Sequence, residues 1–270
     1  MNTVRAQHGS SLLEMVIVIV IIGVIGATVA IFVKAPVDGY FDSLRRAALT
    51  DTADTAVRRM ARDIRRSLPN SVRIPSPDVE CLELIPTKMG GRYRGAVGVA
   101  ASGNILNFVA ADSSFNMLGR NSDLPQNQQI QVNDLVAVYN LGVPGADAYL
   151  EENTSRVVAV VDGLETVITI VPKLFPIASG GKRFHVIPES ENVVAYVCDD
   201  DGKLRRTVRA FGDSTCPATG SILATNVSAC SFVHDVSDLQ QNAPAQLSIS
   251  LTDSGESVSL YMQVYVNNTP

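Results

Sequence analysis

Residues 9–33 read GSSLLEMVIVIVIIGVIGATVAIFV, and Glu14 is the one formally charged side chain among them. An apolar run of this length can cross the hydrocarbon core of a bilayer, about 30 Å thick, as an α-helix. A carboxylate at the centre of that core costs on the order of 3 kcal/mol, and less near an interface, so its presence indicates a function. We therefore predict a transmembrane helix over residues 10–33 and a charged partner for Glu14.

The partner that we expect for Glu14 is an amino group. If the chain is cut between Gly9 and Ser10, Ser10 carries a free, positively charged amine at the edge of the apolar stretch. A spacing of four residues puts Ser10 and Glu14 on one face of a single helix. A neighbouring helix, staggered along its axis, could present Glu14 to Ser10 equally well, and the sequence leaves both arrangements open.

The arrangement of Gly9, Ser10 and Glu14 resembles the amino terminus of type IV pilins and pseudopilins. In that family a short leader ends in glycine, and glutamate is the fifth residue after the cut. The resemblance implies that prepilin peptidase removes residues 1–9 and that Ser10 is N-methylated. This chain has serine at the position where phenylalanine is most common in the family.

Two other interpretations of the apolar stretch are an uncleaved signal anchor and a signal peptide that is cut after the stretch. Ordinary signal peptidase requires small residues at an A-x-A-like site. Residues 27–35 offer no good match, since Lys34 and Ala35 are followed by Pro36. Under either interpretation the chain would be an ordinary signal-directed periplasmic protein.

Arg5 and the initiator amine precede the apolar stretch, so the positive-inside tendency places residues 1–9 in the cytoplasm and everything after Val33 in the periplasm. The helical period of apolar residues persists beyond the stretch and predicts one helix from about Ser10 to Leu68. The apolar stripe consists of Val37, Phe41, Leu44, Ala48, Val57, Met60, Ala61, Ile64 and Leu68. Pro69 should end the helix, whose periplasmic half is residues 34–68, and Pro36 and Gly39 could kink it.

From Pro69 onward short β-branched runs replace the helical period, so residues 69–270 are predicted to form a β-rich domain. The candidate strands are 79–85, 105–110, 135–139, 156–161, 166–171, 184–187, 193–198 and 204–210, followed by a hairpin of 247–251 and 258–266. Two polar inserts, 112–133 and 141–154, are predicted to be surface loops, and Gly90-Gly91 a turn. The fold class is α+β, with the long helix packed on a mostly antiparallel β-sheet domain.

The four cysteines, Cys81, Cys198, Cys216 and Cys230, all follow the apolar stretch, and none forms a C-x-x-C pair. An even number of cysteines outside the cytoplasm favours disulfides. The pairing that we favour joins Cys198 to Cys216 around the polar turn at Asp201-Gly202, which leaves Cys81 for Cys230. Four buried thiols are the alternative.

The net charge of −5 is unevenly distributed along the chain. Residues 34–68 carry eight basic and five acidic side chains, whereas residues 69–270 carry thirteen basic and twenty-one acidic ones. An acidic domain argues against nucleic acid as the main partner, because phosphate binding requires a basic surface. Five arginines lie opposite Met60 and Ile64 on the predicted helix, where they form either a solvated face or a contact with an acidic neighbouring subunit. They are Arg58, Arg59, Arg62, Arg65 and Arg66.

The sequence contains no G-x-S-x-G, H-E-x-x-H or Walker motif, and His185 and His234 stand on strand patterns. The triplet Asp199-Asp200-Asp201 lacks the remaining ligands of a calcium loop and is predicted to form a hairpin turn. We therefore predict that the chain is not an enzyme and has no catalytic residues, cofactor or metal.

The helix end ARDIRRSLPNSVR (residues 61–73) and the tail SLYMQVYVNN (residues 259–268) resemble minor pilins of the mannose-sensitive haemagglutinin (MSHA) pilus system. More broadly they are similar to J-type pseudopilins of type II secretion. This resemblance implies an accessory, low-copy subunit that helps to initiate or cap a pilus. Its implied partners are prepilin peptidase, other minor and major pilins, the inner-membrane assembly platform and membrane lipid. The rival hypothesis is a tip-displayed or membrane-anchored binding module whose insert 112–133 recognises a surface ligand.

Overall fold

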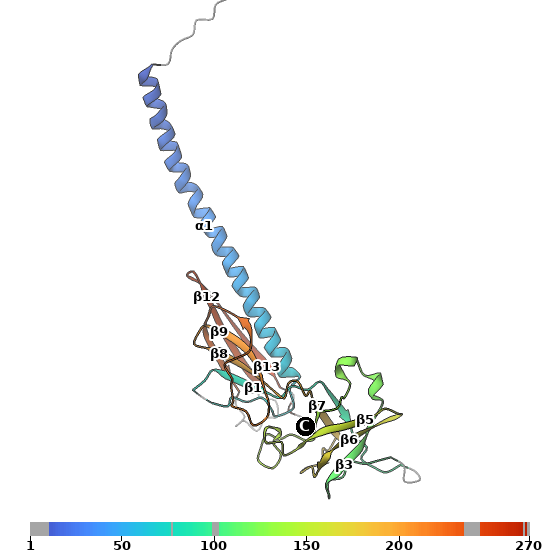
Figure 1. The fold of residues 1–270 in the computed structure, drawn as a ribbon. Helices are drawn as coiled ribbons and strands as arrows, with labels where there is room; N and C mark the ends of the chain where they lie inside the picture. The colour runs from blue at the N-terminus through green and yellow to red at the C-terminus, as the bar shows by residue number, and fades with distance from the viewer. Residues whose placement is uncertain (1–10, 77, 99–102, 235–243, 267, 269–270) are drawn as a thin grey trace, which may run out of the picture. The chain divides into compact units, whose positions relative to one another are not determined.

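A computed structural model describes residues 11–76, 78–98, 103–234, 244–266 and 268 (Figure 1). The chain divides into two compact units, residues 1–48 and residues 49–270. The helix α1 (Leu12–Arg65) contributes residues to both units. All the strands of the described chain belong to the second unit.

Three antiparallel sheets make up the second unit together with the end of α1, which confirms the predicted α+β class (Figure 1). The four-stranded sheet, in the order β1-β8-β9-β10, contains β1 (Cys81–Leu84), β8 (Val193–Asp199), β9 (Lys203–Arg209) and β10 (Ser221–Ala224). The three-stranded sheet contains, in order, β11 (Val227–Val233), β12 (Pro244–Asp253) and β13 (Glu256–Tyr265). The six-stranded sheet, in the order β2-β7-β4-β5-β6-β3, contains β2 (Met89–Arg92), β3 (Asp112–Leu118), β4 (Leu135–Ala137), β5 (Thr154–Val161), β6 (Glu165–Lys173) and β7 (Arg183–Ile187).

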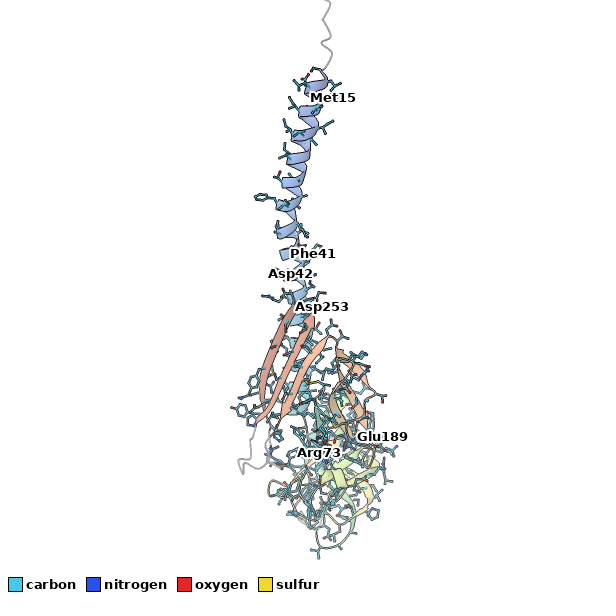
Figure 2. All side chains as sticks on the ribbon, turned by 90° about the vertical axis from the view of Figure 1, so that its left-hand side faces the viewer. Met15, Phe41, Asp42, Arg73, Glu189 and Asp253 are labelled. Carbon is cyan, nitrogen blue, oxygen red and sulfur yellow. A yellow bond between two sulfur atoms is a disulfide. The ribbon has the colours of Figure 1, made fainter. Side chains whose placement is uncertain are left out.

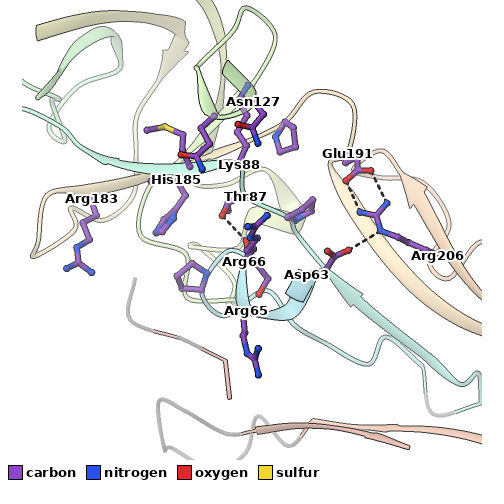
Figure 3. A pocket seen from close by; sticks show the side chains of 17 residues that line it. Asp63, Arg65, Arg66, Thr87, Lys88, Asn127, Arg183, His185, Glu191 and Arg206 are labelled. Atoms are coloured by element: carbon purple, nitrogen blue, oxygen red, sulfur yellow. Dashed lines mark hydrogen bonds and ion pairs between the residues drawn. The ribbon is translucent and has the colours of Figure 1, made fainter. Parts of the chain in front are cut away.

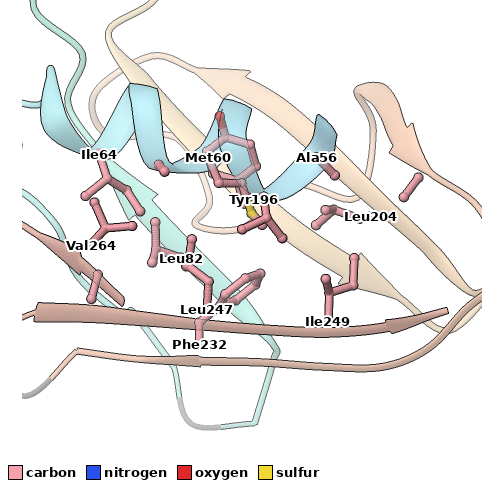
Figure 4. Packing of buried hydrophobic residues seen from close by; sticks show 14 of the residues in the cluster. Ala56, Met60, Ile64, Leu82, Tyr196, Leu204, Phe232, Leu247, Ile249 and Val264 are labelled. Atoms are coloured by element: carbon pink, nitrogen blue, oxygen red, sulfur yellow. The ribbon is translucent and has the colours of Figure 1, made fainter. Parts of the chain in front are cut away.

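The part of α1 in the second unit packs one face on a core that it shares with two sheets (Figure 4). Its buried residues recur every three or four positions, which is the spacing of one helix face. They are Leu49, Ala53, Ala56, Val57, Met60, Ala61 and Ile64. Tyr196 of β8 and Leu247 of β12 belong to the same core. The helix ends at Arg65 rather than at Leu68, because the Leu68 N–H already donates to the carbonyl of Ile85 at 2.8 Å.

The six-stranded sheet has a separate core around Phe115 and Phe184, whose rings meet edge to face at 5.4 Å. Phe115 lies on β3, within the insert 112–133 that we predicted to be a surface loop, and that prediction is wrong for its first seven residues. Only Phe115 and Met117 of β3 are buried, and the three preceding residues of the strand, 112–114, are polar, so the alternation is too short to indicate a strand. The rest of this insert includes the short helices η2 (Asn121–Asp123) and η3 (Gln126–Gln128).

Apart from the segment 105–110, every predicted strand corresponds to an observed one. That segment turns instead, because the Asn107 side-chain oxygen accepts the N–H of Val109 at 2.7 Å. The insert 141–154 was also misjudged, since Tyr149 in the short helix η4 (Ala148–Leu150) is buried. The strands missed by sequence reasoning are β2, β3, β10 and β11.

Gly90 and Gly91 lie in strand β2 and do not form the predicted turn. An ideal Cβ on Gly91 would lie 2.7 Å from the ring of Phe184. Glycine therefore lets β2 pass directly over that ring, which is a packing requirement that the dipeptide itself does not reveal. The predicted turn at Asp199-Asp200-Asp201 is confirmed as the connection between β8 and β9, with Asp199 paired to Lys203.

The disulfides are Cys81–Cys216 and Cys198–Cys230, so the pairing that we favoured is wrong. The register of β1 on β8 sets Cys81 opposite Val197, which places Cys198 on the other face of the sheet. Cys198 thus faces the core shared with Cys230 of β11, whereas Cys81 faces the small cluster that includes Cys216. Closeness in sequence suggested Cys216 as the partner of Cys198, but the segment carrying Cys216 lies on the opposite face.

Replacing both Cys198 and Cys230 by serine should lower the free energy of unfolding by about 2–4 kcal/mol, because the bridge closes a long loop in the unfolded chain. The two cysteines are 32 residues apart. Chemical denaturation of the oxidised protein would measure the loss. Peptide mapping without reduction is the accompanying check, and a peptide that joins Cys198 to Cys216 would contradict the observed connectivity.

Candidate functional site

The amino-terminal part of α1 exposes apolar side chains in every direction (Figure 2). Every residue from 11 to 41 is exposed, and Ile31 and Phe32 are 73% and 82% exposed. A helix that is apolar on all sides requires lipid or other helices around it. The segment is long and apolar enough to cross a membrane.

Glu14 lies in the first turn of α1 and is exposed. Ser11 caps this turn, since its hydroxyl oxygen accepts the N–H of Leu13 at 3.2 Å and its carbonyl accepts the N–H of Glu14 at 3.0 Å. A carboxylate gains about 0.3–1 kcal/mol from the positive end of a helix. That gain is smaller than the cost of about 3 kcal/mol for a carboxylate at the centre of a membrane. The predicted cleavage and methylation residues, Gly9 and Ser10, lie outside the described residues.

The other polar side chains of the apolar segment are satisfied within the helix. The Thr28 hydroxyl donates to the carbonyls of Val24 and Ile25, each at 2.9 Å. Such bonding lets a hydroxyl sit in lipid without an outside partner. Glu14, the one charged side chain of residues 11–33, has no charged partner among the residues that the structure describes.

The five arginines predicted to lie opposite the apolar stripe are all exposed, while Met60 and Ile64 are buried. Arg58 donates to Asp54 at 2.6 Å, and this hydrogen bond raises the pKa of Arg58. The remaining four have no carboxylate partner within the described part of the chain: Arg59, Arg62, Arg65 and Arg66. The helix face therefore carries an uncompensated positive charge.

Asp63, the carboxylate nearest in sequence to these arginines, is already hydrogen-bonded to residues outside the helix (Figure 3). It accepts the Tyr196 hydroxyl at 2.6 Å and the Arg206 guanidinium at 3.0 Å. Arg206 also donates to both oxygens of Glu191 at 2.8 Å. Burial and the nearby Asp63 raise the pKa of Tyr196, so its hydroxyl stays protonated and keeps donating. This network attaches α1 to the four-stranded sheet.

A second ionic cluster is buried around Glu83 on β1, and sequence reasoning missed it. Arg209 donates to both oxygens of Glu83 at 2.8 Å, and Arg73 donates at 2.9 Å. Arg73 also lies 3.5 Å from the ring centre of Tyr149, whose hydroxyl donates to the carbonyl of Ser71 at 2.7 Å. Burial alone would raise the pKa of Glu83, but hydrogen bonds from Arg209, the Cys216 N–H and Arg73 bring it below its ordinary value.

His185 lies on strand β7 and is largely enclosed by the protein. Burial is the main cause that lowers the pKa of His185 to about 4, and Arg183 adds to it, so this imidazole is neutral at pH 7. In the described residues, no three His, Cys, Asp or Glu side chains are grouped so that they could hold a metal ion.

Comparison with known protein families finds a match to the amino-terminal segment described above. Residues 4–30 match the prokaryotic N-terminal methylation motif, a range that includes Gly9, Ser10 and Glu14. No curated protein sequence and no solved structure matches the chain.

The methylation motif supports the class of type IV pilin-like proteins, whose members are typically structural and not catalytic. It implies processing by prepilin peptidase and association with other pilins. Together with the single apolar helix α1, it fits a protein anchored in the membrane by one pass.

Proposed function

We propose that this chain is a minor type IV pilin that takes part in the assembly or initiation of an MSHA-type pilus, in the manner of the minor pilin MshO that it resembles. In this proposal residues 1–9 are the leader, 10–33 the transmembrane helix, and 34–68 the periplasmic half of the helix. Residues 69–270 form a periplasmic β-rich domain. The observation that carries the proposal is Glu14, a charge without a partner among the described residues, in an otherwise apolar and fully exposed helix segment.

The proposed mechanism makes polymerisation the event that satisfies this charge. After cleavage, the Ser10 amine of one subunit lies at the level of Glu14 in its staggered neighbour. Forming the ion pair offsets the cost of a carboxylate in lipid, whereas a solitary subunit continues to bear that cost. The surrounding apolar residues keep the processed subunit in the inner membrane, its amino terminus at the cytoplasmic face, until a neighbour is available.

Mass spectrometry of the mature amino terminus tests the proposal directly. We expect a peptide that starts at Ser10 and is heavier by one methyl group. A Gly9→Val variant is the control, because a bulky residue before the cut should block cleavage and leave residues 1–9 attached. A wild-type chain that starts at Met1, or beyond Ala30, would refute the proposal.

The alternative function, a binding module displayed at a pilus tip or on the membrane, has less support. We placed its ligand site on the insert 112–133, and the first part of this insert is strand β3 of the six-stranded sheet. Phe115 and Met117 of that strand are buried. The exposed surface of the insert consists of Ser113 and Leu118 of β3 and most of the segment that contains η2 and η3.

A further inference from the structure

A basic groove of about 550 Å³ lies in the second unit, where the end of α1 meets strands β2 and β7 (Figure 3). Its charged lining consists of Asp63, Arg65, Arg66, Lys88, Arg183, Glu191 and Arg206. Both of its carboxylates are bound by Arg206, and Lys88 is paired with Asp134. We call the three remaining residues, Arg65, Arg66 and Arg183, the arginine groove. None of the three has a carboxylate partner in the described chain.

A second hollow, of about 450 Å³, lies elsewhere on the same unit and is lined by acidic side chains. Asp78, Glu80, Asp199 and Asp200 line this hollow, and no cationic side chain lines it. Arg205 pairs with Asp199 at 2.5 Å, so the uncompensated carboxylates are those of Asp78, Glu80 and Asp200, which we call the acidic rim. The rim has no cationic partner among the described residues, and its three residues are exposed.

The acidic rim is held in place covalently. Cys198, Cys216 and Cys230 line the same hollow, so both disulfides border it. A surface that is already fixed before binding loses little conformational freedom on contact. The three unpaired guanidiniums of the arginine groove and the three unpaired carboxylates of the acidic rim are complementary in number and in sign.

We propose that the arginine groove of one copy of this chain binds the acidic rim of a second copy. The contact is head to tail, because it joins two different surfaces, and it can therefore extend beyond a dimer. A nucleic acid is a poorer occupant of the groove, since Asp63 and Glu191 also line it and residues 69–270 have an excess of eight acidic side chains. This contact goes beyond the proposed function, which concerns the amino-terminal segment of α1.

Mixing two variants of the full chain tests the contact. The groove variant replaces Arg65, Arg66 and Arg183 by alanine, and the rim variant replaces Asp78, Glu80 and Asp200 by alanine. Energy transfer between labelled copies in vesicles of neutral lipid would report association. We expect each variant alone to associate about tenfold or more weakly than the wild type. The equimolar mixture should recover dimers, since each pair retains one intact groove and one intact rim.

A third variant, with Arg58, Arg59 and Arg62 replaced by alanine, is the matched control. It removes the same number of positive charges, all of them from α1, but leaves the groove lining unchanged, so its association should stay within about twofold of the wild type. Thermal unfolding of all variants would verify that they fold.

Three results would overturn the proposed contact. The wild type could show no more energy transfer than random encounter gives, the control variant could lose as much association as the groove variant, or the equimolar mixture could fail to recover association. Tight binding of a DNA oligonucleotide that the groove variant loses, with unchanged self-association, would assign the groove to another ligand. The mature amino terminus is measured independently. A methylated Ser10 combined with a failed mixing experiment would remove this contact and leave the proposed function standing.

Discussion

Replacing Glu14 by alanine should reduce recovery of the protein in purified pili or tip complexes by about ten- to hundredfold while membrane insertion stays unchanged. The carboxylate costs on the order of 3 kcal/mol in lipid, and its removal takes away both that cost and the partner of the neighbouring Ser10 amine. The apolar residues that drive insertion are untouched. Quantitative immunoblots of the membrane fraction and of purified pili would measure the two quantities separately.

Two further variants distinguish charge from shape at this position. Glu14→Gln keeps the size and polarity of the side chain but not its charge, and it should fail in the same way as alanine. Thr28→Ala is the matched control, because the Thr28 hydroxyl bonds only to carbonyls of its own helix. Undiminished recovery of the Glu14→Ala protein in pili would exclude the proposed ion pair.

Replacing Glu83 by glutamine should lower the free energy of unfolding by about 3–5 kcal/mol, the range found when one partner of a buried ion pair is removed. Glu83 is fully buried and the side chain of Arg209 is only 5% exposed, so that guanidinium would be left without its counter-charge. Arg73, which is 34% exposed, would lose a partner that is easier to replace with water. Denaturation by urea would measure the change.

The pair between Arg94 and Glu165 is the comparison for Glu83. It is also a pair in which arginine donates twice to glutamate, but its side chains are 22% and 24% exposed. Glu165→Gln should therefore destabilise the protein much less, because water can solvate the remaining arginine. Equal losses for the two variants would show that burial does not determine the contribution of Glu83.

Glu83 should also make the stability depend on pH. Its pKa in the folded protein lies below the ordinary value of about 4.3, so the unfolded chain takes up the proton first as the pH falls. The contribution of Glu83 is complete above that ordinary value and is lost as the pH falls through the folded pKa. The free energy of unfolding of the wild type should therefore approach that of Glu83→Gln as the pH falls. A difference in the free energy of unfolding between the two proteins that stays constant down to the folded pKa of Glu83 would contradict this assignment.

Local patterns in the sequence were sufficient for the elements whose partners are close in sequence or whose environment is uniform. The apolar run around Glu14 predicts a helix without reference to any other part of the chain, since every face of it meets a similar environment. The β12–β13 hairpin and the Asp199–Lys203 turn were predicted correctly. Their signals, apolar–polar alternation and turn-forming residues, lie within a few neighbouring positions of the sequence.

The tertiary structure alone decided the features that depend on which distant segments become neighbours. Cys198 pairs with Cys230 because the register of β1 on β8 divides the cysteines between two faces. Glu83 is enclosed by arginines from two other segments, and the arginine groove joins residues 65 and 66 to residue 183. Local sequence periodicity does not predict such contacts, because they stabilise the protein only when strands from separate regions pack together and exclude water. The sequence by itself therefore determined the apolar helix segment and the class of protein that it indicates, and the packing of the sheets determined the rest.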